Sequence, residues 1–63
     1  MEHSIQIIFE SNGEIKYVHE DLYYTNDAGA AGVFTEEYAN KVASNIRARR
    51  YDVIVDVVKH SDL

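Results

Sequence analysis

The sequence predicts an α+β fold with the element order β-β-α-β, in which one helix packs on one face of a three-stranded antiparallel sheet. Three observations support this prediction. Two apolar segments flank the turn sequence "SNG", residues 34–50 place apolar side chains at helical spacing, and a run rich in β-branched residues follows. The chain has 63 residues. We therefore expect one domain, residues 1–63, which buries only about 60% of its unfolded surface.

The two segments around "SNG" are expected to form a β-hairpin. "SIQIIFE" alternates its side chains at the period of a strand, and "EIKYVHED" follows the turn. A two-residue Asn-Gly turn would set Phe9 opposite Lys16 and interrupt the apolar face. A three-residue loop, 11–13, pairs Phe9 with Ile15 and collects the apolar side chains on one side. We therefore expect the three-residue loop, with Gly13 at positive φ.

The helix and the last strand complete the predicted sheet. Thr35 precedes two glutamates, as an N-cap residue does, and "YDVIVDVVKH" is typical of a strand. This last strand cannot enter a tight hairpin, so it is expected at the free edge of the first strand, which gives the strand order 2-1-3. The expected core consists of Ile5, Ile7, Phe9, Ile15, Tyr17, Val53, Val55 and Val57 in the sheet, and of Phe34, Tyr38, Ala39, Val42 and Ile46 against it.

The net charge of −5 is distributed unevenly along the chain. Residues 1–40 contain eight acids and one base, residues 41–50 contain four bases and no acid, and residues 51–63 contain three acids and one base. Acids in the first turn of a helix and arginines in its last turn also fit the ordinary chemistry of helix ends. Because phosphate binding needs a basic surface, direct binding of nucleic acid is the less favoured expectation.

The composition excludes several classes of protein. There is no cysteine, which excludes disulfides and cysteine-based zinc sites and fits a reducing compartment. No apolar run approaches the roughly 18 residues of a membrane span. The start, "MEHSIQIIFE", lacks the basic region of a signal peptide. We expect a cytoplasmic protein that does not enter the membrane.

Residues with catalytic potential are present but poorly grouped. The carboxylate pairs Glu20-Asp21 and Glu36-Glu37 would need a pocket that raises one pKa, and so small a domain has little room for one. No serine has an evident base beside it. The three histidines lack a metal-ligand spacing, and "DAGAAG" lacks the lysine of a phosphate-binding loop. We expect no enzymatic activity, no metal and no cofactor.

The stretch "LYYTNDAGAAGVF", residues 22–34, follows no structural period and is longer than a crossover requires. It is too apolar for plain disorder. Tyrosines beside carboxylates favour protein binding, whereas the alternative is that these tyrosines plug the ends of a small core. The predicted partner-binding residues are Glu20, Asp21, Tyr23, Tyr24, Asp27, Glu36 and Glu37.

The leading functional hypothesis is a non-enzymatic interaction module, an inhibitor or adaptor that binds a basic protein surface through these acids. One form of it is a nucleic-acid mimic that blocks a DNA- or RNA-handling enzyme. Small acidic proteins with which phages and mobile elements block host defences resemble the chain in size and charge. The alternative is a nucleic-acid-binding module that uses the tyrosines with Lys41, Arg47, Arg49 and Arg50. A purely structural or assembly protein is the third class.

A homodimer is also expected, because three strands and one helix make a thin core without staples. The sequence leaves two modes open. Either the β-branched last strands pair along their free edges, or the outer sheet faces pack together. The predicted interface consists of Ile8, Val18, Ile54, Val55 and Val58.

Overall fold

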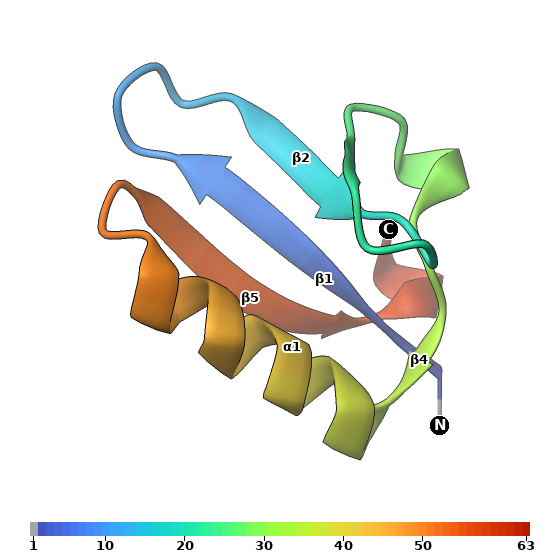
Figure 1. The fold of residues 1–63 in the computed structure, drawn as a ribbon. Coiled ribbons are helices and arrows are strands. Elements are labelled where there is room, and N and C mark those ends of the chain that lie inside the picture. The colour runs from blue at the N-terminus through green and yellow to red at the C-terminus, as the bar shows by residue number, and fades with distance from the viewer. Residues whose placement is uncertain (1) are drawn as a thin grey trace.

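The computed structural model describes residues 2–63, and one α-helix packs there against a curled antiparallel sheet (Figure 1). The α+β class is therefore confirmed. In chain order the elements are β1 (Glu2–Phe9), β2 (Ile15–Val18), β3 (Tyr24–Thr25), the 3-10 turn η1 (Ala28–Ala30), β4 (Phe34–Thr35), α1 (Glu36–Arg49), β5 (Val53–Lys59) and the 3-10 turn η2 (His60–Asp62).

The sheet has five strands within residues 2–63, so the predicted three-stranded sheet of order 2-1-3 is wrong. The order is β3-β2-β1-β4, and β5 pairs with β1 in addition. On one side, β1 pairs antiparallel with β5 from Phe9↔Val53 to His3↔Lys59. On its other side, β1 pairs first with β2 and then, near its start, with β4. The extra strands β3 and β4 have two residues each, which is too short to leave a period in the sequence.

The hairpin register also differs from the prediction. Ile8 pairs with Ile15 and Ile7 with Lys16, so the turn has a four-residue loop, 10–13, and not the expected three. Gly13 donates its N–H to the carbonyl oxygen of Phe9 at 2.7 Å. Its φ of +72° confirms the expected left-handed conformation.

The shift of one residue turns β2 over, because neighbouring side chains of a strand face opposite sides. Val18, which we expected on the outer face, is only 1% exposed and lies in the core. Ile15, which we expected in the core, is 43% exposed on the outer face. The expectation failed because both registers offer β2 an apolar side chain for the core, Ile15 in one and Val18 in the other, so the apolar pattern does not decide between them.

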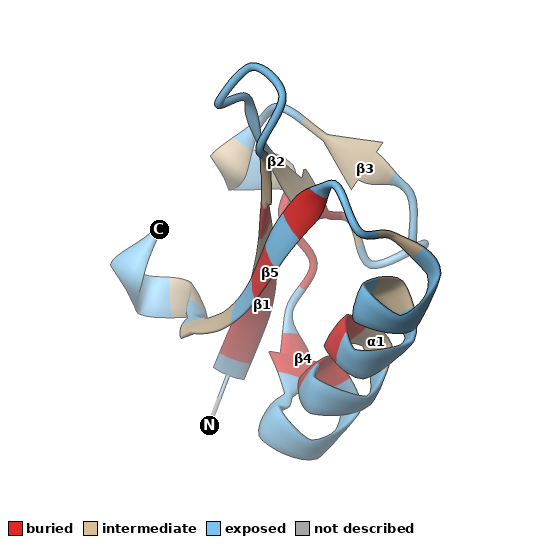
Figure 2. Ribbon diagram, turned by 90° about the vertical axis from the view of Figure 1, so that its left-hand side faces the viewer, coloured by how far each residue is buried: buried red, intermediate tan, exposed pale blue. Residues whose placement is uncertain are grey.

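The helix begins as expected. Thr35 is the N-cap, and its hydroxyl oxygen accepts the N–H of Tyr38 at 3.2 Å. Ala39 and Ala43 are fully buried and let α1 lie close to β1 and β5. Tyr38, expected in the core, is instead 45% exposed. Because α1 covers only this part of the sheet, β2 and β3 curl past its side (Figure 2).

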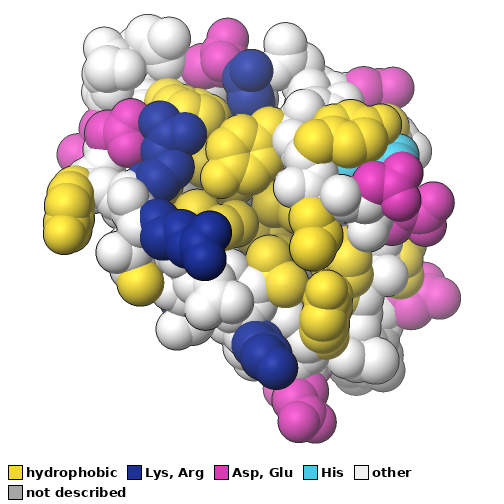
Figure 3. Space-filling view, viewed as in Figure 1, with side chains coloured by type: hydrophobic (Ala, Val, Ile, Leu, Met, Phe, Trp, Pro, Cys, Tyr) yellow, Lys and Arg dark blue, Asp and Glu magenta, His cyan; other side chains and the backbone are white. Residues whose placement is uncertain are grey.

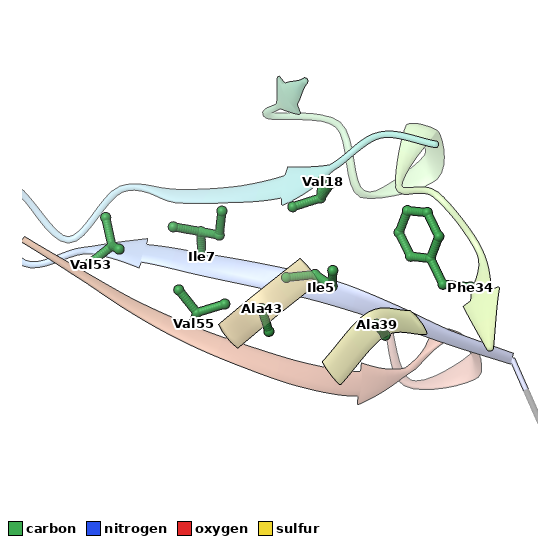
Figure 4. Packing of buried hydrophobic residues seen from close by; sticks show 8 residues of the cluster. All are labelled: Ile5, Ile7, Val18, Phe34, Ala39, Ala43, Val53 and Val55. Atoms are coloured by element: carbon green, nitrogen blue, oxygen red, sulfur yellow. The ribbon is translucent and has the colours of Figure 1, made fainter. Parts of the chain in front are cut away.

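The core lies between α1 and the concave face of the sheet. Figure 4 shows its side chains converging from both layers. Each fully buried isoleucine contributes on the order of 1.5–3 kcal/mol. The cluster consists of Ile5, Ile7, Val18, Phe34, Ala39, Ala43, Val53 and Val55.

The irregular segment between β2 and α1 returns to the sheet through Gly32. The N–H of Gly32 bonds the carbonyl oxygen of Val18 at 2.8 Å. A Cβ atom at Gly32 would lie 2.5 Å from the backbone nitrogen of Glu20, so only glycine lets the two backbones approach this closely. This contact places β4 in line with β2 along the same side of β1. No helix within the described part of the chain is long and apolar enough to span a membrane.

Candidate interaction surfaces

The predicted acids gather at one end of the molecule. We call Glu20, Asp21, Asp27, Glu36 and Glu37 the acidic end. The first two lie in the turn between β2 and β3, Asp27 caps η1, and the two glutamates open α1. These three elements lie on the right-hand side of Figure 1, where β4 joins them. All five carboxylates are exposed, and residues 17–40 contain neither lysine nor arginine.

Histidines are the only ion-pair partners of the acidic end within residues 2–63. Glu36 lies 3.4 Å from Nε2 of His3, and Asp21 lies 3.7 Å from Nδ1 of His19. Neither contact involves a permanent cation. Within the acidic end itself no lysine or arginine neutralises the five carboxylates, and the nearest lysine along α1, Lys41, lies one helical turn beyond Glu37.

The two neighbouring tyrosines have different environments. Tyr23 is 54% exposed and stacks on His19, with the ring centroids 4.3 Å apart. Tyr24 points toward the sheet and meets the edge of Phe9 with centroids 6.5 Å apart. Tyr23 therefore lies on the surface, as a partner-binding residue would, whereas Tyr24 packs against the core, as the alternative prediction held.

The turn between β2 and β3 has an unusual backbone. It is a three-residue loop, 20–22, in which His19 and Tyr23 close the hairpin through a bond of 2.8 Å. Leu22 takes the left-handed position of this loop with φ +69°. Glycine usually occupies that position, because another residue costs about 1–2 kcal/mol there. Leu22 is nevertheless 49% exposed. The turn was not predictable from the sequence, because "HEDLY" contains no glycine or asparagine.

A groove runs between α1 and this turn. It has a volume of about 360 Å³. We call it the helix groove, and its lining residues are Leu22, Tyr38, Lys41, Val42, Asn45 and Arg49. Figure 3 shows hydrophobic side chains gathered in the middle of this face, with Lys and Arg side chains toward its left and lower margins. The groove leaves no local signal in the sequence, because Leu22 and the helix residues that line it are distant in the chain.

The basic residues of the rival hypothesis divide into two pairs. Arg47 donates to the backbone oxygen of Val55. Arg50 bonds both carboxylate oxygens of Asp52, at 3.1 and 2.9 Å, and lies 5.2 Å from the ring centre of Phe9. Lys41 and Arg49 make no ion pair within residues 2–63, and both line the helix groove.

A buried serine lies beside a histidine on the outer face of the sheet. Oγ of Ser4 donates to the carbonyl oxygen of Gly32 at 2.7 Å and lies 2.8 Å from Nδ1 of His60. The single hydroxyl proton is thus committed to Gly32, and His60 must donate to Ser4. A catalytic base would have to accept that proton instead. The arrangement is that of a structural tie between β1, the irregular segment and η2.

The remaining titratable groups do not converge. The three histidines lie at separate places, beside Glu36, Tyr23 and Ser4 respectively. Within residues 2–63, no three side chains of His, Asp or Glu gather in a way that would hold a metal ion. A second cleft of about 250 Å³ is lined by residues 29–33 together with His19 and Glu20.

Comparison with known proteins adds no relative. No family model, curated protein or solved structure matches the chain.

Proposed function

We propose that the protein is a non-enzymatic interaction module, an inhibitor or adaptor, which binds a basic surface of a protein partner through the acidic end. The observation that supports this most is the separation of charge. Residues 17–40 contain five acids and no lysine or arginine, and all five acids are exposed. Such a surface steers a basic partner and raises the rate of association.

The acidic end is also held in a defined shape. The side chain of Asp27 accepts the N–H of Gly29 at 2.8 Å, and the stacked rings of His19 and Tyr23 brace the neighbouring turn. Tyr23 adds a large and exposed contact area at small entropic cost. A preorganised cluster of carboxylates loses little freedom on binding.

A nucleic-acid mimic is the more specific form of this proposal. Carboxylates on a turn, a 3-10 turn and a helix start would occupy a groove that normally holds phosphates. The target would then be an enzyme that handles DNA or RNA. Such a mimic competes with nucleic acid for the target, because both bind the same site.

The test is affinity capture from a lysate of cells that naturally produce the protein, at about 50 and about 300 mM salt. One variant neutralises the acidic end with Gln and Asn. Its control neutralises five other exposed acids, which gives the same net charge: Glu2, Glu10, Glu14, Asp56 and Asp62. We expect the partner to be lost at high salt and from the first variant only. Equal retention by both variants would overturn the proposal, and release by duplex DNA would support the mimic.

The nucleic-acid-binding alternative has fewer residues available than the sequence suggested. Arg47 and Arg50 are engaged within the chain, which leaves Lys41 and Arg49. Fluorescence anisotropy with single-stranded and duplex DNA tests this alternative. Binding that falls steeply with salt and is lost in Lys41→Glu would favour it over the acidic end.

We also propose a homodimer formed by the outer faces of two sheets. Ile15, Ile8 and Ile54 lie opposite one another across three strands, and α1 covers only the other face. Val18 and Val55 are core residues, so they do not belong to this face. The edge mode is less favoured, because Arg47 already bonds the backbone of Val55.

Light scattering tests the dimer directly. Ile54 is 47% exposed, so Ile54→Lys should leave the fold intact and convert the dimer to a monomer. A monomeric native protein at tens of micromolar would overturn the proposal.

A further inference from the structure

We propose that the helix groove is a second binding site, which takes an extended acidic peptide segment of another protein with apolar side chains between its carboxylates. This site adjoins the acidic end, but it shares no residue with it, and its two charged side chains, Lys41 and Arg49, are positive. The inference rests on the shape of the groove, on two cations without ion-pair partners, and on the strained Leu22 in its wall.

The groove has the dimensions of a short extended peptide. One stripe of α1 supplies its wall, with Tyr38, Val42, Asn45 and Arg49 at helical spacing. At 1.5 Å per residue this stripe is about 16 Å long, which matches about five residues of an extended chain. Leu22 faces the stripe from the turn between β2 and β3.

The charges of the groove define the acidic character of its ligand. Lys41 and Arg49 lie eight positions apart on α1, which is about 12 Å along the helix axis. An extended peptide covers that distance in three to four residues. Two carboxylates at this spacing would meet both cations. Asn45 lies between these two positions and offers both a donor and an acceptor to the peptide backbone.

Leu22 supplies the second, independent observation. Its left-handed backbone carries strain, and its side chain remains half exposed, so it contributes little to the core. The bond from His19 to Tyr23 and the stacking of their rings hold it in place. A large apolar side chain in this position provides contact area for an occupant of the groove.

Nucleic acid fits the groove less well than a peptide. Glu20 and Asp21 belong to the same three-residue loop as Leu22, so a long polyanion along the groove would meet their negative charge. A short segment ends before this repulsion becomes large. Leu22 and Val42 also favour aliphatic side chains over stacked bases.

The test is an NMR titration of the isotope-labelled full chain with the capped pentapeptide Asp-Leu-Ile-Asp-Leu. We expect saturable shifts confined to the amides of the groove residues. The peptide Asp-Gly-Gly-Asp-Gly keeps the charge without the apolar side chains and should bind at least about tenfold more weakly. The peptide Lys-Leu-Ile-Lys-Leu should not bind. Absent or scattered shifts, or equal binding of the glycine peptide, would overturn the proposal, as would a DNA duplex that shifts the same amides.

Variants separate the groove from general charge effects. Lys41→Glu and Arg49→Glu should each weaken binding of the pentapeptide about fivefold. Lys59→Glu is the matched control, because Lys59 is exposed at the end of β5 and outside the groove. An equal loss in this control would reject the site. The variant with a neutralised acidic end should still bind the peptide, so the two proposals can fail independently.

A substitution of Leu22 distinguishes binding from structure. Leu22→Asn suits the left-handed backbone and removes the apolar wall. We expect about fivefold weaker peptide binding, while the thermal midpoint does not fall. Unchanged peptide binding, whether or not the thermal midpoint falls, would show that Leu22 serves the fold alone.

Discussion

Each of the two hairpin turns of the sheet contains one residue with a left-handed backbone, but the type of residue at that position differs between the turns. The first turn, 10–13, uses Gly13 at φ +72°. The second, 20–22, uses Leu22 at φ +69°. Glycine adopts this conformation without strain, whereas leucine does not. The first turn therefore has the residue type that its backbone favours, whereas the second holds a half-exposed leucine that lies outside the core cluster.

The two turns are also anchored by different contacts. The first turn is anchored to the end of the sheet, where Glu10 donates its N–H to the backbone of Asp52 at 3.0 Å and Arg50 covers Phe9. The second is anchored by Gly32, which lies against its backbone, and by the stacked rings of His19 and Tyr23. It opens onto both proposed binding surfaces. Substitutions at the two turns should therefore have different consequences.

The largest effect is expected at the anchor of the second turn. Gly32→Ala would place a Cβ atom 2.5 Å from the backbone nitrogen of Glu20. The backbones must separate, and we expect a loss of about 3 kcal/mol in the free energy of unfolding. Urea denaturation measures it. In the control Gly29→Ala, the new atom approaches only the side chain of Asp27, at 3.2 Å. Similar losses in both variants would contradict the proposed anchoring role.

A smaller loss is expected at the first turn. Gly13→Val forces a β-branched residue into the left-handed region, although nothing lies within 4 Å of a Cβ atom at this position. We expect the free energy of unfolding to fall by about 1–2 kcal/mol, from backbone strain alone. Asparagine tolerates this conformation, so Gly13→Asn should change the stability much less. Chemical denaturation of both variants measures the two losses in the free energy of unfolding, and equal losses would exclude backbone strain as the cause.

At the second turn, substitution of the left-handed residue should not lower the free energy of unfolding. Leu22→Asn relieves the left-handed strain and removes a half-exposed side chain, so we expect the free energy of unfolding to stay constant or to rise by up to about 1 kcal/mol. Val33 is 44% exposed and has an ordinary backbone. Val33→Asn therefore controls for the loss of apolar surface and should be slightly destabilising. Thermal denaturation compares the two, and a clear loss in Leu22→Asn would remove the contrast between the turns.

The smallest effect concerns pH at the anchor of the first turn. The hydrogen bond from Arg50 lowers the pKa of Asp52 below its ordinary value. Asp52 therefore contributes stability above its unfolded pKa, and the contribution is lost as the pH falls through the folded pKa, below about pH 4. Asp52→Asn should be slightly less stable than the wild type at pH 7, and the difference should shrink as the pH falls through the acidic range. A constant difference across this range would assign the effect to something other than ionisation.

Local signals in the sequence predicted the α+β class, the cap at Thr35 and the conformation of Gly13. The register of β2 was not predictable from the same signals. Ile8, Ile15 and Ile54 form an apolar row on the outer face, so the sequence offers apolar residues to both sides of the sheet. Strands of two residues leave no pattern, which explains the missing β3 and β4.

Among the candidate surfaces, too, only the features that are visible locally in the sequence were predicted. The acidic end was predicted because charge is visible along the chain. The helix groove was missed because helical spacing alone assigned Tyr38 to the core. The stripe that faces the sheet is centred on Ala39 and Ala43, which are fully buried, whereas Tyr38 is 45% exposed. The contact between Ser4 and His60 spans 56 positions, and no local pattern can indicate it.

The place of β1 in the sheet has a consequence for how the protein folds. β1 precedes the other strands and its longest partner, β5, follows them, so the pairs from Phe9↔Val53 to His3↔Lys59 join positions far apart in the sequence. Closing such a long loop precedes any gain from the contact, so folding should be slow for a chain of this size. A nascent chain that lacks β5 exposes one whole side of β1. The turn between β2 and β3 can close early by itself, but the groove beside it exists only after α1 has docked on the completed sheet.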